Sequence, residues 1–176
     1  MTIHSEHPFL PPDEERDPVR RLRGRIGGTV SLWTAGEGVE RAGLTVSSYL
    51  VAPGAPARVV ALIDPASDLL ERFEQTGVAV LQLLEWRHRD LAEAFAGLLP
   101  SPGGPFRRGE WDETAWGPRL VDAGAWAGLR LAPDVGGEPR QVGWSVLVEA
   151  VVEHVEIGDE RAPLVHRRGR YVAPVD

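Results

Sequence analysis

Hydroxyl side chains are concentrated in one short stretch of the chain, Thr45-Val46-Ser47-Ser48-Tyr49. Side chains of an extended strand alternate between its two faces, so Thr45, Ser47 and Tyr49 are expected on one face and Val46 and Ser48 on the other. A row of hydroxyls beside strand backbone offers several hydrogen-bond donors and acceptors to a flat heteroaromatic ligand. The same pattern is typical of a half-buried strand facing water, and composition alone leaves both interpretations open.

Several other kinds of chemistry are excluded by residues that the chain lacks. All 19 basic residues are arginine, so no lysine can form a Schiff base or serve a phosphate-binding loop. Cysteine is absent, which excludes disulfides and thiolate catalysis. The histidines do not stand at a metal-ligand spacing such as HExxH, so no metal site is predicted. We assign no catalytic role to any side chain.

The charge of the chain limits its partners. Its formal charge is −7 and its pI is near 5.3, which disfavours nucleic acid as a partner because the phosphates of nucleic acid need a basic surface. The N-terminal residues contain no apolar run of signal-peptide length, and nowhere do about eighteen apolar residues follow one another. We therefore expect a cytoplasmic protein that does not enter a membrane.

Strand patterns dominate the chain after a short N-terminal segment. Residues 1–18 are predicted to form an arm, and a single domain is predicted over 19–173. A short helix capped by Asp13 is expected to end at Gly24. Strands are expected at about 26–34, 40–51, 58–63, 78–84, 125–132, 143–157 and 163–172.

Two helices are predicted between the early and late strands. The first is expected to start at Asp64-Pro65 and to end near Gly77, and the second starts near Trp86 and places Leu91, Phe95 and Leu98 on one face. Residues 100–118 are expected to form a long loop. This order predicts an α+β, mainly β fold, in which short peripheral helices cover a β-barrel.

Short motifs follow one another in an order that resembles a known family. The first two are Gly-Thr-Val-Ser-Leu-Trp-Thr at 28–34 and Gly-Leu-Thr-Val-Ser-Ser-Tyr at 43–49. Further motifs lie at 58–64, 77–81, 90–97, 118–120, 127–129, 163–166 and 169–171. Over about residues 19–172 this collinear order resembles the flavin-reductase-like proteins, the small reductase components of two-component monooxygenases.

The resemblance implies a fold, a cofactor and partners. It implies an FMN-binding split β-barrel homodimer that binds FMN, or alternatively FAD, takes hydride from NADH or NADPH and supplies reduced flavin to a partner monooxygenase. Residues 45–48 would contact the flavin ring and ribityl chain, a serine at a helix start would face the phosphate, and the C-terminal hairpin would approach the ring. The residues assigned to the cofactor in this way are Thr45, Val46, Ser47, Ser48, Ser67, His166 and Tyr171.

Two positions depart from the pattern of the family, and two carboxylates near Ser67 oppose its implied role. Many relatives carry Gly-Asp-His before the long late strand, a motif associated with nicotinamide use, whereas this chain has Gly143-Trp144-Ser145. Many also carry Asn in the strand before the second helix, where this chain has Leu81-Gln82. Asp64 and Asp68 flank Ser67 and would repel a phosphate unless an arginine such as Arg58 or Arg87 offset them.

Three functions are compatible with these residues. The first is an NAD(P)H-dependent flavin reductase. The second is a non-catalytic flavin-binding barrel that has lost the nicotinamide site, which the missing histidine after Gly143 favours. The third is an interaction protein without a cofactor, in which the hydroxyls of residues 45–49 only face water.

Overall fold

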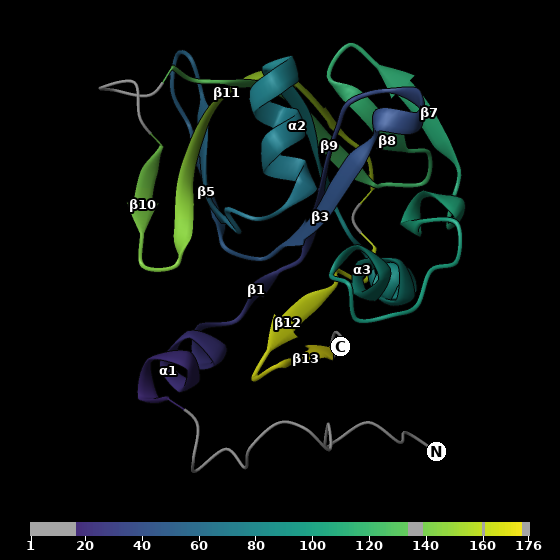
Figure 1. Cartoon of the computed structure of the whole chain (residues 1–176). Helices are drawn as coiled ribbons and strands as arrows, with labels where there is room; N and C mark the ends of the chain where they lie inside the picture. Colours follow the sequence, from purple (N-terminus) through teal and green to yellow (C-terminus); the bar gives the residue numbers. More distant parts are fainter. Residues whose placement is uncertain (1–16, 134–138, 160, 174–176) are drawn as a thin grey trace.

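The fold is a curled antiparallel sheet with helices at its periphery (Figure 1). The computed structural model describes residues 17–133, 139–159 and 161–173. The helices are α1 (Pro18–Ile26), α2 (Asp68–Thr76) and α3 (Arg89–Phe95), with short 3-10 turns η1 (Gly38–Glu40), η2 (Trp86–His88) and η3 (Pro105–Arg107). The strands are β1 (Gly28–Thr29), β2 (Ser31–Ala35), β3 (Ala42–Val46), β4 (Tyr49–Ala52), β5 (Arg58–Ile63), β6 (Val78–Leu83), β7 (Trp111–Thr114), β8 (Gly117–Leu120), β9 (Ala125–Leu131), β10 (Arg140–Val142), β11 (Ser145–Ile157), β12 (Val165–Arg167) and β13 (Arg170–Val172).

The main sheet curls until its two ends meet. Its strand order is β3-β2-β6-β9-β11-β5-β4, with β10 paired to β11. β3 and β4 lie at opposite ends of this path, yet only Ser47 and Ser48 separate them in sequence. The sheet must therefore bend into a barrel that is open at one seam, and the predicted mainly β barrel with short peripheral helices is confirmed. Two small sheets, β1-β12-β13 and β7-β8, accompany it.

The strand predicted over 40–51 is broken into β3 and β4. Val46 pairs with Ser31 of β2, whereas Tyr49 pairs with Ala61 of β5. The chain changes partner strand between these pairs, and the Leu62 amide donates to the Ser48 carbonyl at 2.9 Å to begin the new ladder. The predicted alternation of faces is therefore wrong beyond Val46, because it assumed one uninterrupted strand.

The ends of the first helices differ from the predicted ends. The Asp17 carboxylate accepts a hydrogen bond from the Val19 amide at 3.0 Å and starts α1, and Gly27 at φ +67° ends it, so Gly24 does not. Asp13 and most of the predicted arm lie outside the described residues. In α2 the capping residue is Ser67 rather than Asp64, while the predicted end at Gly77 is confirmed.

Two segments around α3 also differ from the expectation. Leu98 lies beyond the helix with 73% of its surface exposed, because Gly97 at φ +72° has already ended the helical path. The predicted loop over 100–118 contains η3 and the β7–β8 hairpin. None of the helices within the described residues has the length and apolar character needed to span a bilayer.

Two apolar clusters hold the barrel together. Inside the curl, Trp33 and Phe73 meet edge to face with ring centroids 6.4 Å apart. α2 thereby covers one opening of the barrel, as Figure 1 shows. On the other side of β2, Leu32 and Leu84 form a cluster with Phe95 of α3. The seam between β3 and β4 lies at the margin of this packed interior.

A buried amide ties the strands to the β7–β8 hairpin. Gln82 is fully buried, donates to the Thr34 hydroxyl at 3.1 Å and accepts from the Leu120 amide at 2.6 Å. The Thr34 hydroxyl in turn donates to the Pro118 carbonyl at 2.5 Å. Gln82 thus satisfies backbone and side-chain groups that water does not reach.

Replacement of Gln82 by leucine is expected to destabilise the fold by about 1–3 kcal/mol, because the Leu120 amide would be left buried without an acceptor. Urea unfolding followed by circular dichroism measures the change. The matched control is Gln75→Leu on the exposed face of α2, which should change the free energy of unfolding by no more than about 0.5 kcal/mol. Equal stability of the Gln82 variant and the wild type would contradict this role.

Candidate functional site

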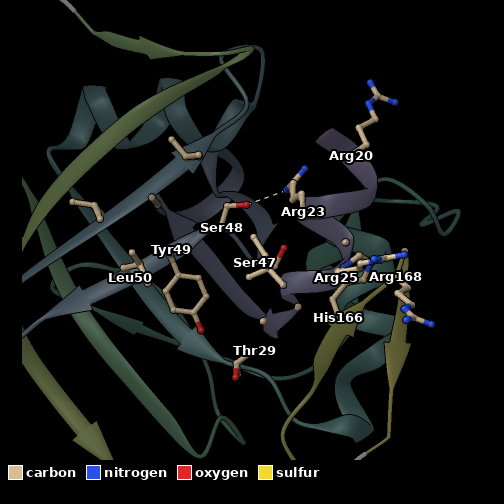
Figure 2. A pocket seen from close by; sticks show the side chains of 18 of the residues that line it. Arg20, Arg23, Arg25, Thr29, Ser47, Ser48, Tyr49, Leu50, His166 and Arg168 are labelled. Carbon is tan, nitrogen blue, oxygen red and sulfur yellow. Dashed lines mark hydrogen bonds between the residues drawn. The ribbon is translucent and has the colours of Figure 1, made fainter. Parts of the chain in front are cut away.

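A cleft of about 1050 Å³ opens at the seam of the barrel. It is bounded by α1, β1, the Ser47-Ser48 connection, the β4–β5 ladder and the β12–β13 turn. Figure 2 shows Ser47 and Ser48 at its centre, with arginine side chains at the α1 and β12–β13 end and Tyr49 and Leu50 at the other. Its volume is of the size that proteins use for cofactors and other small ligands.

Of the four residues predicted to contact a ring, Ser47 and Ser48 line this cleft, and Thr45 and Val46 line a smaller cavity beside it. Their polar groups have different partners. The Thr45 hydroxyl donates to the Ala92 carbonyl of α3 at 2.6 Å and is already engaged. The Val46 carbonyl accepts from the Ser31 hydroxyl at 2.8 Å. Ser48 accepts from the Arg23 guanidinium at 2.9 Å. Within the described residues the Ser47 hydroxyl has no hydrogen-bond partner, so Ser47 is the side chain best placed to receive one from a ligand.

At the floor of the cleft, the backbone of β1 lies close to the backbone of Ser47. A Cβ atom at Gly28 would lie 3.3 Å from the Ser47 carbonyl oxygen, a tight contact, so β1 runs close to the seam backbone at this glycine. The Thr29 side chain also lines the cleft. Backbone groups of two strands therefore converge where a flat ligand would meet hydrogen-bond donors and acceptors.

One wall of the cleft is apolar. Leu50, Leu62 and Leu147 line it, and Tyr49 packs between the cleft and the inner cluster. Burial raises the pKa of the Tyr49 phenol, an effect that the nearby Ser31 hydroxyl partly offsets. Tyr49 therefore stays neutral and presents a ring and a hydroxyl, not a charge.

The opposite wall is cationic, a feature that sequence reasoning missed. It is formed by the side chains of Arg20, Arg21, Arg23, Arg25 and Arg168. Basic residues near the end of a helix also suit the helix dipole, so their presence there does not by itself indicate a binding surface. Their number in a nine-residue helix was the signal that could have indicated a binding surface.

The two residues predicted from the C-terminal hairpin occupy different environments. His166 lines the cleft, and burial together with the positive charge of Arg23 lowers the pKa of its imidazole. The ring of Tyr171 lies edge to face with His166 at 5.6 Å but packs into the cluster beneath α3. Burial, with a smaller contribution from Glu93, raises the pKa of Tyr171 to about 12. Tyr171 therefore packs against His166 and does not itself line the cleft.

Ser67, the residue predicted to face the phosphate, does not line the cleft. Its hydroxyl donates to the Asp64 carbonyl at 2.8 Å and accepts from the Leu70 amide at 3.3 Å as the cap of α2. Neither arginine expected to offset the nearby carboxylates is available, because Arg58 pairs with Glu149 and Arg87 with Glu85. The phosphate role of Ser67 stays a prediction without support from its position.

A second, smaller cavity of about 400 Å³ adjoins the seam. Thr45, Ser47, Asp64, Trp144 and Ser145 are among its lining residues. The Trp144 side chain stands in the β10–β11 turn with 77% of its surface exposed. The Arg20 guanidinium lies 5.4 Å from its ring centroid, in cation–π contact. An exposed aromatic surface thus stands at the edge of this cavity.

An antiparallel sheet that curls into an open barrel, with a ligand-sized cleft at its seam, is the split β-barrel fold. Residues 23–174 match the flavin reductase like domain family. This match covers most of the chain, so the protein belongs to that family, as the motif order predicts.

Individual relatives agree with this assignment. The FMN reductase (NADH) RutF of Ancylobacter novellus is 26% identical over 163 residues, which span 92% of this chain and 87% of the relative. The structure of the flavin reductase PheA2 superposes with a TM-score of 0.78 at 21% identity, covering 92% of this chain and all of that one. The NADH:FAD oxidoreductase SgcE6 of Streptomyces globisporus C-1027 gives a TM-score of 0.76 at 20% identity, covering 93% and 95%.

The pKa of His166 is expected to depend on Arg23. In Arg23→Gln the pKa should rise because a repelling charge is removed, yet remain below 6.5 because burial is the larger cause. Since the folded-state pKa is depressed, His166 stabilises the fold above its unfolded pKa, and this contribution is lost as pH falls through the folded value. Imidazole NMR titration measures the shift, with Arg58→Gln as control. An unchanged pKa in Arg23→Gln would contradict the coupling.

Proposed function

We propose that the protein is an FMN-binding flavin reductase that uses NADH or NADPH and delivers reduced flavin to a partner monooxygenase, in the cytoplasm. The observation that carries this proposal is the cleft at the Ser47-Ser48 seam in a chain of the flavin reductase like domain family. The RutF relative is named an FMN reductase (NADH), and the styrene monooxygenase flavin reductase of Pseudomonas putida S12, at a TM-score of 0.76 and 19% identity, is named a monooxygenase component.

The residues present fit a flavin. Its tricyclic ring has two apolar faces and a polar edge, which suit the leucine wall and the seam backbone beside Ser47. Its phosphate is anionic, and the arginine wall supplies cations. FAD would add a second phosphate and an adenosine, and α1 beside the cleft has no buried residue, so both flavins remain compatible with it.

When bound, the flavin accepts hydride from a nicotinamide and carries the electrons onward. The protein contributes position and polarity. Ser47 and the backbone around it would orient the polar edge of the ring, Leu50 and Leu62 would exclude water from one side, and neutral His166 would offer a hydrogen-bonding nitrogen without a competing charge. No proton transfer by a side chain is required in this scheme.

A second copy of the chain is proposed to cover the apolar side of the cleft. Leu50 and Val51 of β4 are 73% and 58% exposed, and Leu62 of the neighbouring strand β5 lines the same cleft. A contiguous apolar surface next to a ligand cleft is typical of an interface rather than of a free surface. The homodimer expected from the family resemblance would bury it and narrow the cleft.

The non-catalytic flavin-binding alternative keeps one observation in its favour. Trp144 and Ser145 stand where many relatives have the Asp-His of the nicotinamide-associated motif. A further structure of SgcE6 is a complex with NAD and FAD fragments. That binding is a property of SgcE6, and for this chain it has to be measured. Turnover separates the two functions, because both predict bound flavin.

The purified protein is expected to bind added FMN and to oxidise NADH or NADPH with FMN under air. Flavin absorbance and fluorescence measure binding, and loss of nicotinamide absorbance at about 340 nm measures turnover. Turnover supports the reductase, and flavin binding without turnover supports the non-catalytic barrel. Absence of both would leave the protein without a flavin function.

Leu50→Asp is expected to convert the dimer into a monomer, because a carboxylate would be buried against the apolar surface of the other copy. Light scattering after size exclusion gives the mass. Val39→Asp is the matched control, because Val39 is a fully exposed apolar residue in η1, outside the proposed interface. A wild type that is monomeric at micromolar concentration would overturn the dimer proposal.

A further inference from the structure

The side-chain partners of the arginines show where positive charge is left uncompensated. Outside the cleft, several arginines pair with carboxylates, as in Arg58–Glu149, Arg72–Glu40, Arg87–Asp122, Arg119–Asp112 and Arg130–Glu153. Over residues 17–133, 139–159 and 161–173, no carboxylate forms an ion pair with Arg20, Arg21, Arg23, Arg25 or Arg168. In a chain of charge −7, this leaves a concentrated positive field at one end of one cleft.

These arginines are held in place by the backbone. The Arg168 amide donates to the Gly24 carbonyl at 2.8 Å and fixes α1 against the β12–β13 turn. Arg168 itself has φ +54°, the left-handed conformation that this tight turn requires. Arg23 reaches Ser48 at 2.9 Å, as the dashed line in Figure 2 marks. The positive wall is therefore joined to the seam at one side and to the hairpin at the other.

The start of α2, where the family resemblance implies a phosphate, is electrostatically unfavourable. The Ser67 hydroxyl is engaged within its own turn, and Asp64 and Asp68 bring two carboxylates to the start of α2. A phosphate there would meet negative charges at short range, and neither Arg58 nor Arg87 could offset them, because both are already paired with glutamates.

We propose that Arg23, Arg25 and Arg168 bind the phosphate group of the flavin, so that the phosphate tail points toward α1 and the β12–β13 turn and not toward Ser67. This inference rests on the proposed function, since it orients the same ligand in the same cleft. Guanidinium groups bind phosphate oxygens through charge-assisted, bidentate hydrogen bonds, and several of them around one dianion outweigh the weak contribution of a single exposed pair.

Two alternative roles of the arginine wall would give a different dependence on the ligand. A solvated helix face would not distinguish flavins with and without phosphate. A pyrophosphate-binding surface for the nicotinamide dinucleotide would affect the nicotinamide and not the flavin. In both phosphate-binding roles the guanidinium groups recognise a phosphate, either that of the flavin or that of the nicotinamide dinucleotide. Comparing flavins that differ in phosphate, and measuring NAD⁺ binding separately, distinguishes the two.

The test compares riboflavin, FMN and FAD binding to wild type, Arg23→Gln and the double variant Arg25→Gln/Arg168→Asn. Asparagine is chosen at 168 because it tolerates the left-handed backbone conformation. Arg170→Gln is the matched control, since it removes one exposed arginine from the same hairpin but lies outside the cleft lining. Ser67→Ala is the comparator for the alternative phosphate position.

Fluorescence quenching gives the dissociation constant of each flavin, and NAD⁺ binding is measured by calorimetry.

The double variant is expected to bind FMN and FAD about tenfold or more weakly, while riboflavin affinity changes by less than about twofold. Arg170→Gln and Ser67→Ala should keep the wild-type ratio of FMN to riboflavin affinity. The FMN advantage of the wild type should shrink with added salt, because counterions screen exposed cations.

The opposite results would overturn the inference. Equal losses for riboflavin and FMN would mean that the arginines support the ring or the fold. Unchanged FMN affinity with weakened NAD⁺ binding would assign the wall to the nicotinamide dinucleotide, and a selective FMN loss in Ser67→Ala would return the phosphate to α2. In each of these cases riboflavin binding by the wild type keeps the proposed function intact. A wild type that binds none of the three flavins would overturn both.

Discussion

The two-residue connection between β3 and β4 is the constraint on which the architecture depends. Consecutive Cα atoms are about 3.8 Å apart, so the three steps from Val46 to Tyr49 hold the ends of a long strand path within about 11 Å of each other. The sheet satisfies this by curling, and its interior is filled by the cluster around Trp33 and Phe73. The chain changes partner strand at this point. Backbone and hydroxyl groups at the seam are therefore not all used in strand pairing, as they would be in a continuous ladder. The covalent link that closes the barrel thus also creates the place where it opens to a ligand.

The polarity of the cleft follows from what packs against that seam. On one side β4 and β5 expose leucines, since their other faces already serve the inner cluster. On the other side α1 has no buried residue and is anchored through the Arg168–Gly24 hydrogen bond, so its side chains are free to serve a ligand rather than a core. A ligand with an apolar, hydrogen-bonding ring and an anionic tail matches this division, whereas a wholly apolar or wholly charged ligand would leave one wall unsatisfied.

The sequence predicted the regular parts of this arrangement well. β5, β6, the long β11 and the end of α2 at Gly77 agree with periodicity and capping signals, because in them local preference and tertiary packing agree. The order of short motifs predicted the family, which no single motif could have done. The break at Ser47-Ser48 was not predicted, since both halves favour strands and only pairing with two different neighbours separates them. Ser67 shows the same difficulty, because a capping serine and a phosphate-binding serine have one sequence signature.

The sign of the local field explains how an acidic protein can hold an anionic cofactor. At physiological ionic strength charges separated by more than about 8 Å are largely screened, so the net charge of −7 says little about a site that five arginines surround. The acidic surface beyond that distance disfavours long polyanions, which would have to lie across it. A small phosphate ester avoids that cost because it fits within the positive region. The local distribution of charge, and not its sum, therefore allows a small phosphate ester to bind in this cleft.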